Sequence, residues 1–357
     1  MSLDIRIASS TKLKQLPPYD ELGFGSHTTD HMFIVNYSEE SSWHNAQIVP
    51  YRKIELDPTA LVLHYAQAIF EGLKIYRKNS GCLSAFRPQS NARRLNNSAQ
   101  IMSMPELPED TFLQALEKLA LIDQRWIPEE PGYSLYVRPT MIATQPTLGV
   151  QPSKEYIFYM ILTPVPAYYK PDMAGFKLLA SHRLSRTSRG DVSDAKTAGN
   201  YGKTITALED AKHKGYDNIL WLGGEGNNWI EEAGITNVFV RFKDIVATPP
   251  LNGRILPGIT RETVVSLLKS RETDVVEKEI SISELCDGID NGSVIEVFMT
   301  GTATVVAPVM TINFKGVDHN LTPCDQPVSR WLYQTISDIQ SGEQEDRMGW
   351  MHDIKDV

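Results

Sequence analysis

The stretch that decides the fold is Asp194-Ala195-Lys196-Thr197-Ala198-Gly199-Asn200-Tyr201, in which a lysine precedes a run of small residues and a tyrosine. Three further motifs follow it along the chain: Glu231-Glu232-Ala233-Gly234-Ile235-Thr236-Asn237, Leu256-Pro257-Gly258-Ile259-Thr260 and Thr300-Gly301-Thr302-Ala303. Together they supply an amine, a phenol, a carboxylate and two turns of small residues. Each of these groups suits a different part of one organic cofactor.

That cofactor is pyridoxal phosphate (PLP), which dictates the reaction class of an enzyme that binds it. The amine of Lys196 can form a Schiff base with an aldehyde, and the phenol of Tyr201 can reach a ring oxygen. A carboxylate at Glu232 would keep the pyridine nitrogen protonated, which makes the ring an electron sink. Each residue alone is better read as a solvated side chain, and their occurrence together favours the site.

The phosphate of such a cofactor needs donors without bulk. Gly258-Ile259-Thr260 is predicted to open a helix after Pro257, and N–H groups at a helix N-terminus bind anions. The run from Thr300 to Ala303 adds hydroxyls and open backbone. As isolated features these are ordinary turns and caps, so they count only in combination.

A competing motif lies close by, in Gly202-Lys203-Thr204, which resembles the end of a nucleotide-binding P-loop. A P-loop needs a glycine where this chain has Thr197, and a P-loop directly follows a strand. No strand-like apolar run leads into this segment. We therefore discount a nucleotide hydrolase.

Composition sets outer limits on the function. The chain has 357 residues, of which 41% are hydrophobic and 22% charged, and this length favours two domains. A formal net charge of −9 disfavours nucleic acid and anionic membranes as partners. The dispersed cysteines, Cys82, Cys286 and Cys324, argue against a disulfide framework or a metal site and fit a reducing compartment. Without a hydrophobic signal core at the N-terminus, we expect a cytoplasmic protein.

Hydrophobic periodicity predicts helices and strands mixed without a strict alternation. Helices are expected over 111–126, 201–214, 261–269 and 328–339, and strands over 133–144, 156–165, 176–183, 218–222 and 237–242. The strand over 156–165 is nearly continuously apolar, which predicts burial on both faces. A proline-rich segment supplies the expected connection between domains. The predicted fold class is α/β (mixed α+β) with mixed sheets, divided into a domain over 1–163, a connection over 164–174 and a domain over 175–357.

The first half carries its own cluster of candidate residues. In Tyr136-Val137-Arg138, strand alternation places Tyr136 and Arg138 on one face, which is unusual for a core strand and favours a pocket wall. Tyr65, Phe70 and Tyr168 are further candidates, although unplaced aromatic residues are more often core than pocket, by roughly two to one.

Taken together, these motifs resemble the branched-chain amino acid aminotransferases, within the fold type IV (class IV) PLP enzymes. The resemblance runs from about Ser26 to Trp350 and keeps several motifs in order. It implies a small N-terminal and a larger C-terminal domain with PLP between them, and at least a dimer. Amino acids and 2-oxo acids are the implied small-molecule partners.

The resemblance also implies a role for each candidate residue. Lys196 would be the catalytic residue that bonds PLP covalently, Glu232 would face the pyridine nitrogen, and Tyr201 would bond the phenolic oxygen. The phosphate would be held by Arg94, Ile259, Thr260 and Thr302. The substrate would be bound by Phe70, Tyr136, Tyr168, Ala303, Tyr65 and Arg138, of which the last two reach the partner subunit's site in family members.

Two departures from the family pattern stand out. Many members have a small hydroxyl residue where this chain has Ile235, which removes one contact expected for the substrate carboxylate. The Cys-x-x-Cys of some animal members is replaced by Thr304 and Ala307, so thiol redox control is not expected.

The resulting hypothesis is transfer of the α-amino group of leucine, isoleucine or valine to 2-oxoglutarate by a homodimer. D-amino acid transaminase and aminodeoxychorismate lyase are alternatives with the same fold. A catalytically silent binding protein is a further alternative, against which the intact Lys196, Tyr201 and Glu232 argue.

Overall fold

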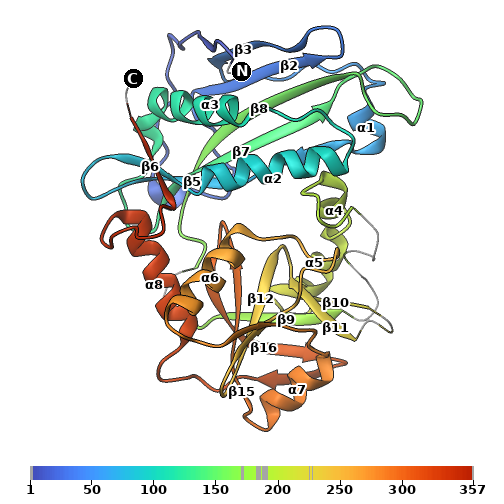
Figure 1. The fold of residues 1–357 in the computed structure, drawn as a ribbon, viewed down its shortest axis with the longest axis vertical. Helices are drawn as coiled ribbons and strands as arrows, with labels where there is room; N and C mark the ends of the chain where they lie inside the picture. The colour runs from blue at the N-terminus through green and yellow to red at the C-terminus, as the bar shows by residue number, and fades with distance from the viewer. Residues whose placement is uncertain are drawn as a thin grey trace. The chain divides into compact units, whose positions relative to one another are not determined.

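The computed structural model describes residues 3–169, 173–181, 186, 192–224, 226 and 228–355. Contacts divide the chain into two compact units (Figure 1). The first unit comprises Met1–Ala167, Ala195–Gly199 and Ser337–Val357, and the second comprises Tyr168–Asp194 and Asn200–Ile336. The domain boundaries predicted from the sequence stay a proposal. The segment that carries Lys196 nonetheless contacts mainly the first unit.

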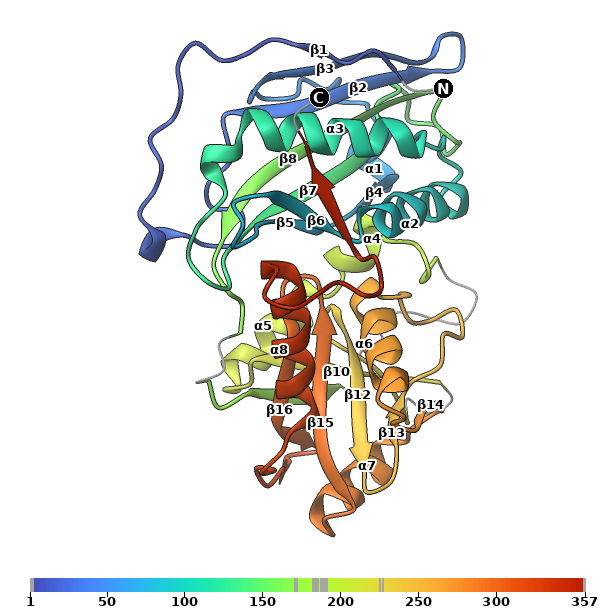
Figure 2. The ribbon, with the colours of Figure 1, turned by 60° about the vertical axis from the view of Figure 1, so that its left-hand side comes forward.

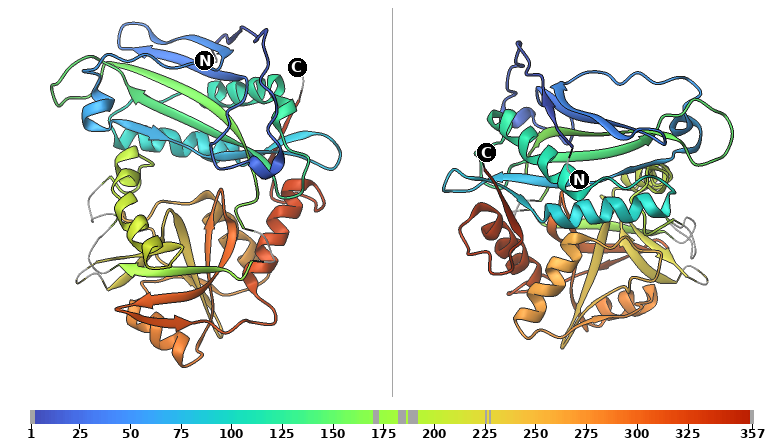
Figure 3. Two further views of the ribbon diagram at one scale, coloured as in Figure 1. Left: turned by 180° about the vertical axis from the view of Figure 1, so that it is seen from behind. Right: turned by 45° about the horizontal axis from the view of Figure 1, so that its top comes forward.

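The first unit is built on one sheet of nine strands, in the order β1-β3-β2-β8-β7-β5-β6-β18, with β4 paired to β7. All pairs are antiparallel except β1 with β3. The longest pair, β7 with β8, runs side by side (Figures 1 and 3). The strands are β1 (Arg6–Ile7), β2 (His31–Ser38), β3 (Ser42–Pro50), β4 (Ala68–Phe70), β5 (Leu73–Arg77), β6 (Leu83–Phe86), β7 (Ser134–Ala143), β8 (Glu155–Val165) and β18 (Met351–Ile354).

Two long helices cover one face of this sheet, α2 (Pro88–Ile101) and α3 (Glu109–Ile122) (Figure 2). Their apolar residues share one core with the inward side chains of the strands, among them Leu116 and Phe158, both fully buried. The short elements of this unit are α1 (Leu61–Tyr65) and the 3-10 turns Tyr19–Glu21 and Gln124–Trp126.

The second unit also contains a sheet of nine strands, in the order β11-β10-β9-β16-β15-β12-β13-β14, with β17 paired to β16 and β11 to β12. This sheet is mixed, because β9 lies parallel to both β10 and β16 and β13 lies parallel to β14. The strands are β9 (Phe176–Ser181), β10 (Asn218–Gly223), β11 (Trp229–Ala233), β12 (Thr236–Phe242), β13 (Val246–Thr248), β14 (Val275–Glu277), β15 (Val294–Gly301), β16 (Val305–Phe314) and β17 (Val317–Asn320).

Alternation along β10 shows how helices cover both faces of the second sheet. Leu220 and Leu222 join the core that includes α7 (Ile282–Asp290), whereas Ile219 and Trp221 pack with α5 (Ile205–His213) on the other face. The remaining helices are α6 (Ile259–Ser270), α4 (Ala198–Gly202) and α8 (Val328–Ser341), and the last two cross the division between the units in sequence. The predicted mixed α+β class is confirmed.

Two element predictions were wrong in part. The helix expected over 201–214 is split into α4 and α5, because the Thr204 hydroxyl and N–H both donate to the Tyr201 carbonyl and close a turn there. Strand β8 is not buried on both faces: Phe158 and Met160 are fully buried, but Ile157 and Tyr159 are only partly so. The helices lie on one face of this antiparallel sheet, which leaves the other face more open.

The hydropathy of the helices bears on membrane insertion. Among the described residues, no helix is both long and apolar enough to span a bilayer.

A buried carboxylate, Asp30, ties the N-terminal segment and the 3-10 turn Gln124–Trp126, which follows α3, to the first sheet. It accepts hydrogen bonds from Lys14 N at 2.7 Å, Arg125 Nη2 at 2.8 Å and Trp126 Nε1 at 2.7 Å. Burial opposes its ionisation, but these donors together hold the pKa of Asp30 below its usual value. A group with a lowered pKa stabilises the fold above its unfolded pKa and loses that contribution in acid.

We therefore expect Asp30→Asn to lower the free energy of unfolding by about 2–3 kcal/mol at neutral pH, since charge-assisted hydrogen bonds are lost. The difference from the wild type should shrink as the pH falls below about 4. Urea titrations at several pH values measure both effects. Glu39→Gln is the control, because Glu39 and its partner Lys154 are 60% and 61% exposed. Equal losses in the two variants would contradict this account.

Candidate active site

The backbone around Lys196 is held by the first unit. Phe70 N donates to Lys196 O at 3.0 Å, and Thr197 forms an antiparallel bridge with Ile69. Lys196 N donates to Ser98 Oγ on α2 at 2.9 Å. These contacts fix a short segment from the middle of the chain against the end of β4.

The ring of Phe70 links the lysine side chain to an aromatic and basic cluster. Lys196 Nζ lies 4.7 Å from the centroid of the Phe70 ring, and the Arg138 guanidinium lies at the same distance, 4.7 Å. Arg138 Nη2 donates to Tyr136 Oη at 2.9 Å, so the prediction that Tyr136 and Arg138 share a face is confirmed. Tyr136 Oη packs against Gly72, where a Cβ atom would lie only 2.0 Å away. A larger residue at Gly72 would therefore displace the tyrosine.

Next to Phe70 in sequence, Glu71 is completely buried. Its carboxylate accepts from Arg94 Nε at 2.6 Å, Arg94 Nη2 at 2.9 Å and Asn91 Nδ2 at 2.7 Å. Burial opposes ionisation, but the charges of Arg94 and Lys196 and the hydrogen bonds hold the pKa of Glu71 below its usual value. Arg94, which the sequence assigned to a phosphate, is thus fixed in orientation by an acid of its own unit.

Lys74 adds a buried amine to the first sheet. It lies opposite Tyr136 in the pairing of β5 with β7, so the two side chains share a face. It is only 4% exposed, and burial lowers its pKa to about 8. Burial therefore favours the neutral form of this amine.

The remaining aromatic candidates lie in more open positions. Tyr65 is 43% exposed at the end of α1, and its hydroxyl donates to Leu148 O at 2.6 Å. Tyr168, in the second unit, is 45% exposed and stacks on Phe176 with ring centroids 5.8 Å apart. Their substrate contacts stay predictions.

In the second unit, Glu232 is 2% exposed on β11. It forms an ion pair with Arg186 Nη2, and its Oε1 accepts from Asn237 Nδ2 at 3.2 Å. The alternative of two adjacent solvated acids is excluded, because Glu231 is also buried, at 3% exposure. Glu232 is therefore a buried carboxylate whose position is fixed by Arg186 and Asn237.

The two turns predicted to hold a phosphate differ from ordinary capped turns. Helix α6 begins at Ile259, within the run Gly258–Thr260 predicted to open a helix and two residues before the start expected from periodicity. Its N-cap is Gly258, which has no side-chain oxygen to cap the first turn. The cradle is tight, because a Cβ on Gly258 would lie 1.9 Å from Asn237 Oδ1. Among the described residues, the buried Thr300 Oγ1 has no hydrogen-bond partner. A helix start without a side-chain cap and an unsatisfied hydroxyl are features that suit an anion.

Other predicted residues of the second unit lie in turns or short helices. Tyr201 is partly buried in α4, and Thr302 and Ala303 form the turn between β15 and β16. Ile235 is 59% exposed in the turn between β11 and β12, where it brings no hydroxyl. The neighbouring Thr236 hydroxyl is already engaged with Ala233 O at 2.6 Å.

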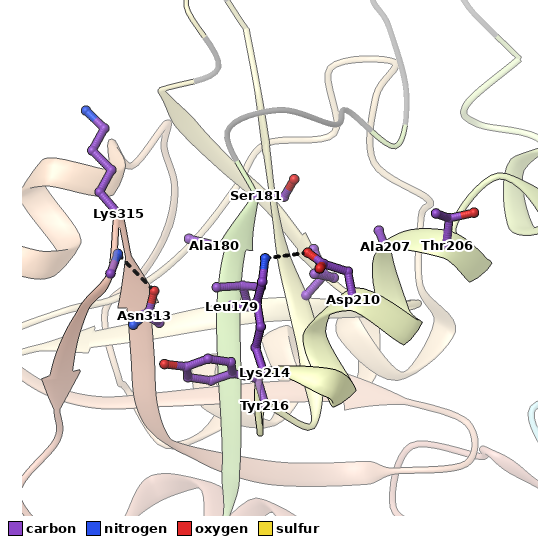
Figure 4. A pocket seen from close by; sticks show the side chains of 12 residues that line it. Leu179, Ala180, Ser181, Thr206, Ala207, Asp210, Lys214, Tyr216, Asn313 and Lys315 are labelled. Atoms are coloured by element: carbon purple, nitrogen blue, oxygen red, sulfur yellow. Dashed lines mark hydrogen bonds and ion pairs between the residues drawn. The ribbon is translucent and has the colours of Figure 1, made fainter.

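A separate hollow of about 1030 Å³ lies in the second unit, lined by residues of β9, α5 and the β16–β17 turn (Figure 4). It contains none of the predicted site residues. Its Lys214 pairs with Asp210 at 2.7 Å, and the Tyr216 hydroxyl donates to Asp318 at 2.7 Å. Lys214 and Asp210 thus form an exposed ion pair of the kind found on ordinary protein surfaces.

The first unit thus contains Lys196, Phe70, Tyr136, Arg138 and Arg94, and Tyr65 in a more open position. The other predicted residues lie in the second unit: Tyr168, Tyr201, Glu232, Ile259, Thr260, Thr302 and Ala303.

Sequence reasoning gave no role to four residues that the structure places at these clusters, namely Glu71, Lys74, Arg186 and Asn237. Charged residues within the apolar run from Ile69 to Ile75 were a usable signal for the first pair. The pairing of Arg186 depends on the tertiary fold and left no local signal.

Comparison with known proteins places these features in a family. The model of the amino-transferase class IV family matches residues 68–312. Branched-chain-amino-acid transaminase 1 of Bacillus subtilis is 41% identical over 345 residues, which cover 96% of each chain. A probable branched-chain-amino-acid aminotransferase of Staphylococcus epidermidis is 40% identical over 358 residues, with 99% of each chain covered.

Solved structures agree on the fold. The Escherichia coli branched-chain amino acid aminotransferase superposes with a TM-score of 0.75 at 25% identity, covering 91% of this chain and 99% of that one. The PLP-form of the Thermobaculum terrenum enzyme gives a TM-score of 0.73 at 22% identity, covering 91% and 98%. With a family model that spans most of its length and relatives 40–41% identical over almost all of it, the chain belongs to the class IV aminotransferases.

Proposed function

We propose that this protein is a branched-chain amino acid aminotransferase, which transfers the amino group of L-leucine, L-isoleucine or L-valine to 2-oxoglutarate. The observation that carries the proposal is 40–41% identity to relatives of that name over almost the whole chain. Class IV aminotransferases depend on PLP, and the Thermobaculum terrenum enzyme was solved in its PLP-form. PLP is accordingly the proposed cofactor here.

Bound PLP would supply the electron sink that lets the substrate Cα give up a proton. The Lys196 amine would hold the cofactor. Once released, the amine would take the proton from the substrate Cα and deliver it to the cofactor. Glu232, held by Arg186 and Asn237, would keep a proton on the ring nitrogen. Tyr201 would donate to the ring oxygen.

The phosphate would be held at the start of α6, by Ile259 and Thr260, together with Thr302 and Arg94. Arg94 suits this task because Glu71 fixes its orientation. Its Nε and Nη2 both donate to the Glu71 carboxylate within 3 Å, which holds the guanidinium in one position. The reaction would proceed by a ping-pong sequence, in which the keto product leaves before the acceptor binds.

The two substrate types differ in side-chain charge, so one pocket must accept both. Phe70, Tyr136 and Tyr168 would contact branched apolar side chains, which such pockets discriminate by only about 1–3 kcal/mol per methylene. Arg138, which lies over the Phe70 ring, would receive the side-chain carboxylate of glutamate. Ala303 and neighbouring backbone would bind the α-carboxylate in place of the hydroxyl that Ile235 lacks.

A homodimer in the cytoplasm is the proposed setting of the reaction. The exposed Tyr65 on α1 supports a role across a subunit boundary, since its ring is held at the surface by the hydrogen bond to Leu148.

Replacing the proposed catalytic lysine gives the first test. Lys196→Ala should lower kcat for L-leucine with 2-oxoglutarate by at least about 10²–10⁴-fold, since the proton carrier is lost. Lys203→Ala is the matched control, because Lys203 is exposed and belongs to the discounted nucleotide-binding motif. Steady-state assays of both variants decide, and an active Lys196→Ala enzyme would refute the assignment.

Arg138 gives a test of dual specificity. Arg138→Met should lower kcat/KM for L-glutamate by about 10–100-fold, because a charge-assisted hydrogen bond is worth about 1.5–3 kcal/mol. The value for L-leucine should stay within about threefold of the wild type. Arg93→Met, at an exposed arginine of α2, should change neither value. Equal losses on both substrates in Arg138→Met would show that Arg138 does not read the acidic side chain.

A further inference from the structure

The strand that carries Glu232 holds a second buried acid, Glu231, whose partner is a different arginine. Arg254 Nε lies 3.0 Å from Glu231 Oε1, and the side chain of Arg254 is 13% exposed. Beneath the carboxylate lies Gly223, where a Cβ atom would come within 1.8 Å of Oε1. The Glu231 carboxylate therefore packs against the backbone of Gly223 and forms an ion pair with Arg254.

Arg254 belongs to the segment over residues 249–258, which links β13 to the N-terminus of α6. This segment is tied down at further points close to Glu232. Arg186 Nη2 donates to Arg254 O at 3.3 Å, and Asn237 Nδ2 donates to Leu256 O at 3.0 Å. The Glu231–Arg254 pair is thus one of several attachments that fix the approach to Gly258, where the phosphate turn begins.

The energetics argue that Glu231 is not present for stability. Burial raises its pKa to about 7, in spite of attraction to Arg254 and Arg186, and repulsion from Glu232 adds to the shift. Neither of its oxygens accepts a hydrogen bond from a described residue. Since the folded pKa lies above the unfolded value, ionisation of Glu231 costs stability as the pH rises from about 4.5 to 7. A neutral replacement of Glu231 removes this cost, and Glu279, 3.7 Å from Arg254, still compensates the charge of the arginine.

We propose that Glu231 is a positioning residue for the phosphate site: through Arg254 it fixes residues 249–258 and so sets the affinity of the Gly258–Thr260 turn for a phosphate monoester. Glu231 itself touches neither the phosphate nor the reacting atoms. The inference rests on the proposed function, because that function includes the phosphate site at α6.

The test compares PLP with pyridoxal, which has the same aldehyde and ring but no phosphate. Dissociation constants for both are measured by absorbance on the full chain after its cofactor has been removed. Glu231→Gln and Arg254→Met should each weaken PLP by about 10-fold, the scale typical of outer-shell positioning partners. Pyridoxal should bind within about twofold of the wild type. Because both changes remove one interaction, the double variant should lose no more than either single variant.

Two further measurements separate positioning from a purely structural role. The melting temperature of Glu231→Gln at pH 8 should equal or exceed that of the wild type, since the ionised acid costs stability. The wild type should lose PLP affinity between pH 8 and pH 6 more steeply than Glu231→Gln, as Glu231 takes up a proton. Glu279→Gln is the control, because Glu279 is 49% exposed and lies 3.7 Å from the same arginine.

The outcomes distinguish the inference from the proposed function. If the wild type binds PLP and transaminates L-leucine but Glu231→Gln binds PLP normally, the positioning role is wrong and the function stands. The positioning role is also wrong if Glu231→Gln weakens the binding of PLP and of pyridoxal equally. It is likewise wrong if the loss of PLP affinity comes with a lower melting temperature of this variant. If the wild type itself does not prefer PLP to pyridoxal, both the function and the inference fall.

Discussion

A short backbone pairing between Thr197 and Ile69 is the constraint on which the first unit's cluster depends. It places Lys196 against Phe70, and the hydrogen bond from Lys196 N to Ser98 fixes the segment from a second side. Since backbone hydrogen bonds define the position of Cα, the lysine side chain starts from a fixed point while its long chain still lets the amine move. A residue that must hold a cofactor and then move a proton needs both properties.

Buried carboxylates supply the second organising feature, and each is matched with its own arginine. Glu71 pairs with Arg94, and Glu232 pairs with Arg186. Burying an ion pair costs desolvation, so such pairs contribute little net stability and are better explained by orientation. In the first pair Arg94 is the proposed contact with the cofactor and Glu71 holds it in place. In the second pair Glu232 is the proposed contact and Arg186 holds it in place.

Part of this arrangement could be predicted from the sequence alone. The helix start at Ile259 and the shared face of Tyr136 and Arg138 follow from local rules, namely the effect of Pro257 and Gly258 and strand alternation. The break between α4 and α5 was missed, because the Thr204 hydroxyl competes with the helix through a single side-chain bond. The arginine partners of the acids lie far from them along the chain, so only the tertiary fold reveals them.

The central claim is that bound PLP accepts an amino group from L-leucine and passes it to 2-oxoglutarate. The visible absorption spectrum of the PLP-loaded protein tests this most directly. We predict a yellow band that disappears when L-leucine is added and returns when 2-oxoglutarate follows. A yellow band that L-leucine leaves unchanged would contradict the claim about the substrate, and a protein that develops no such band with PLP would contradict the role of Lys196.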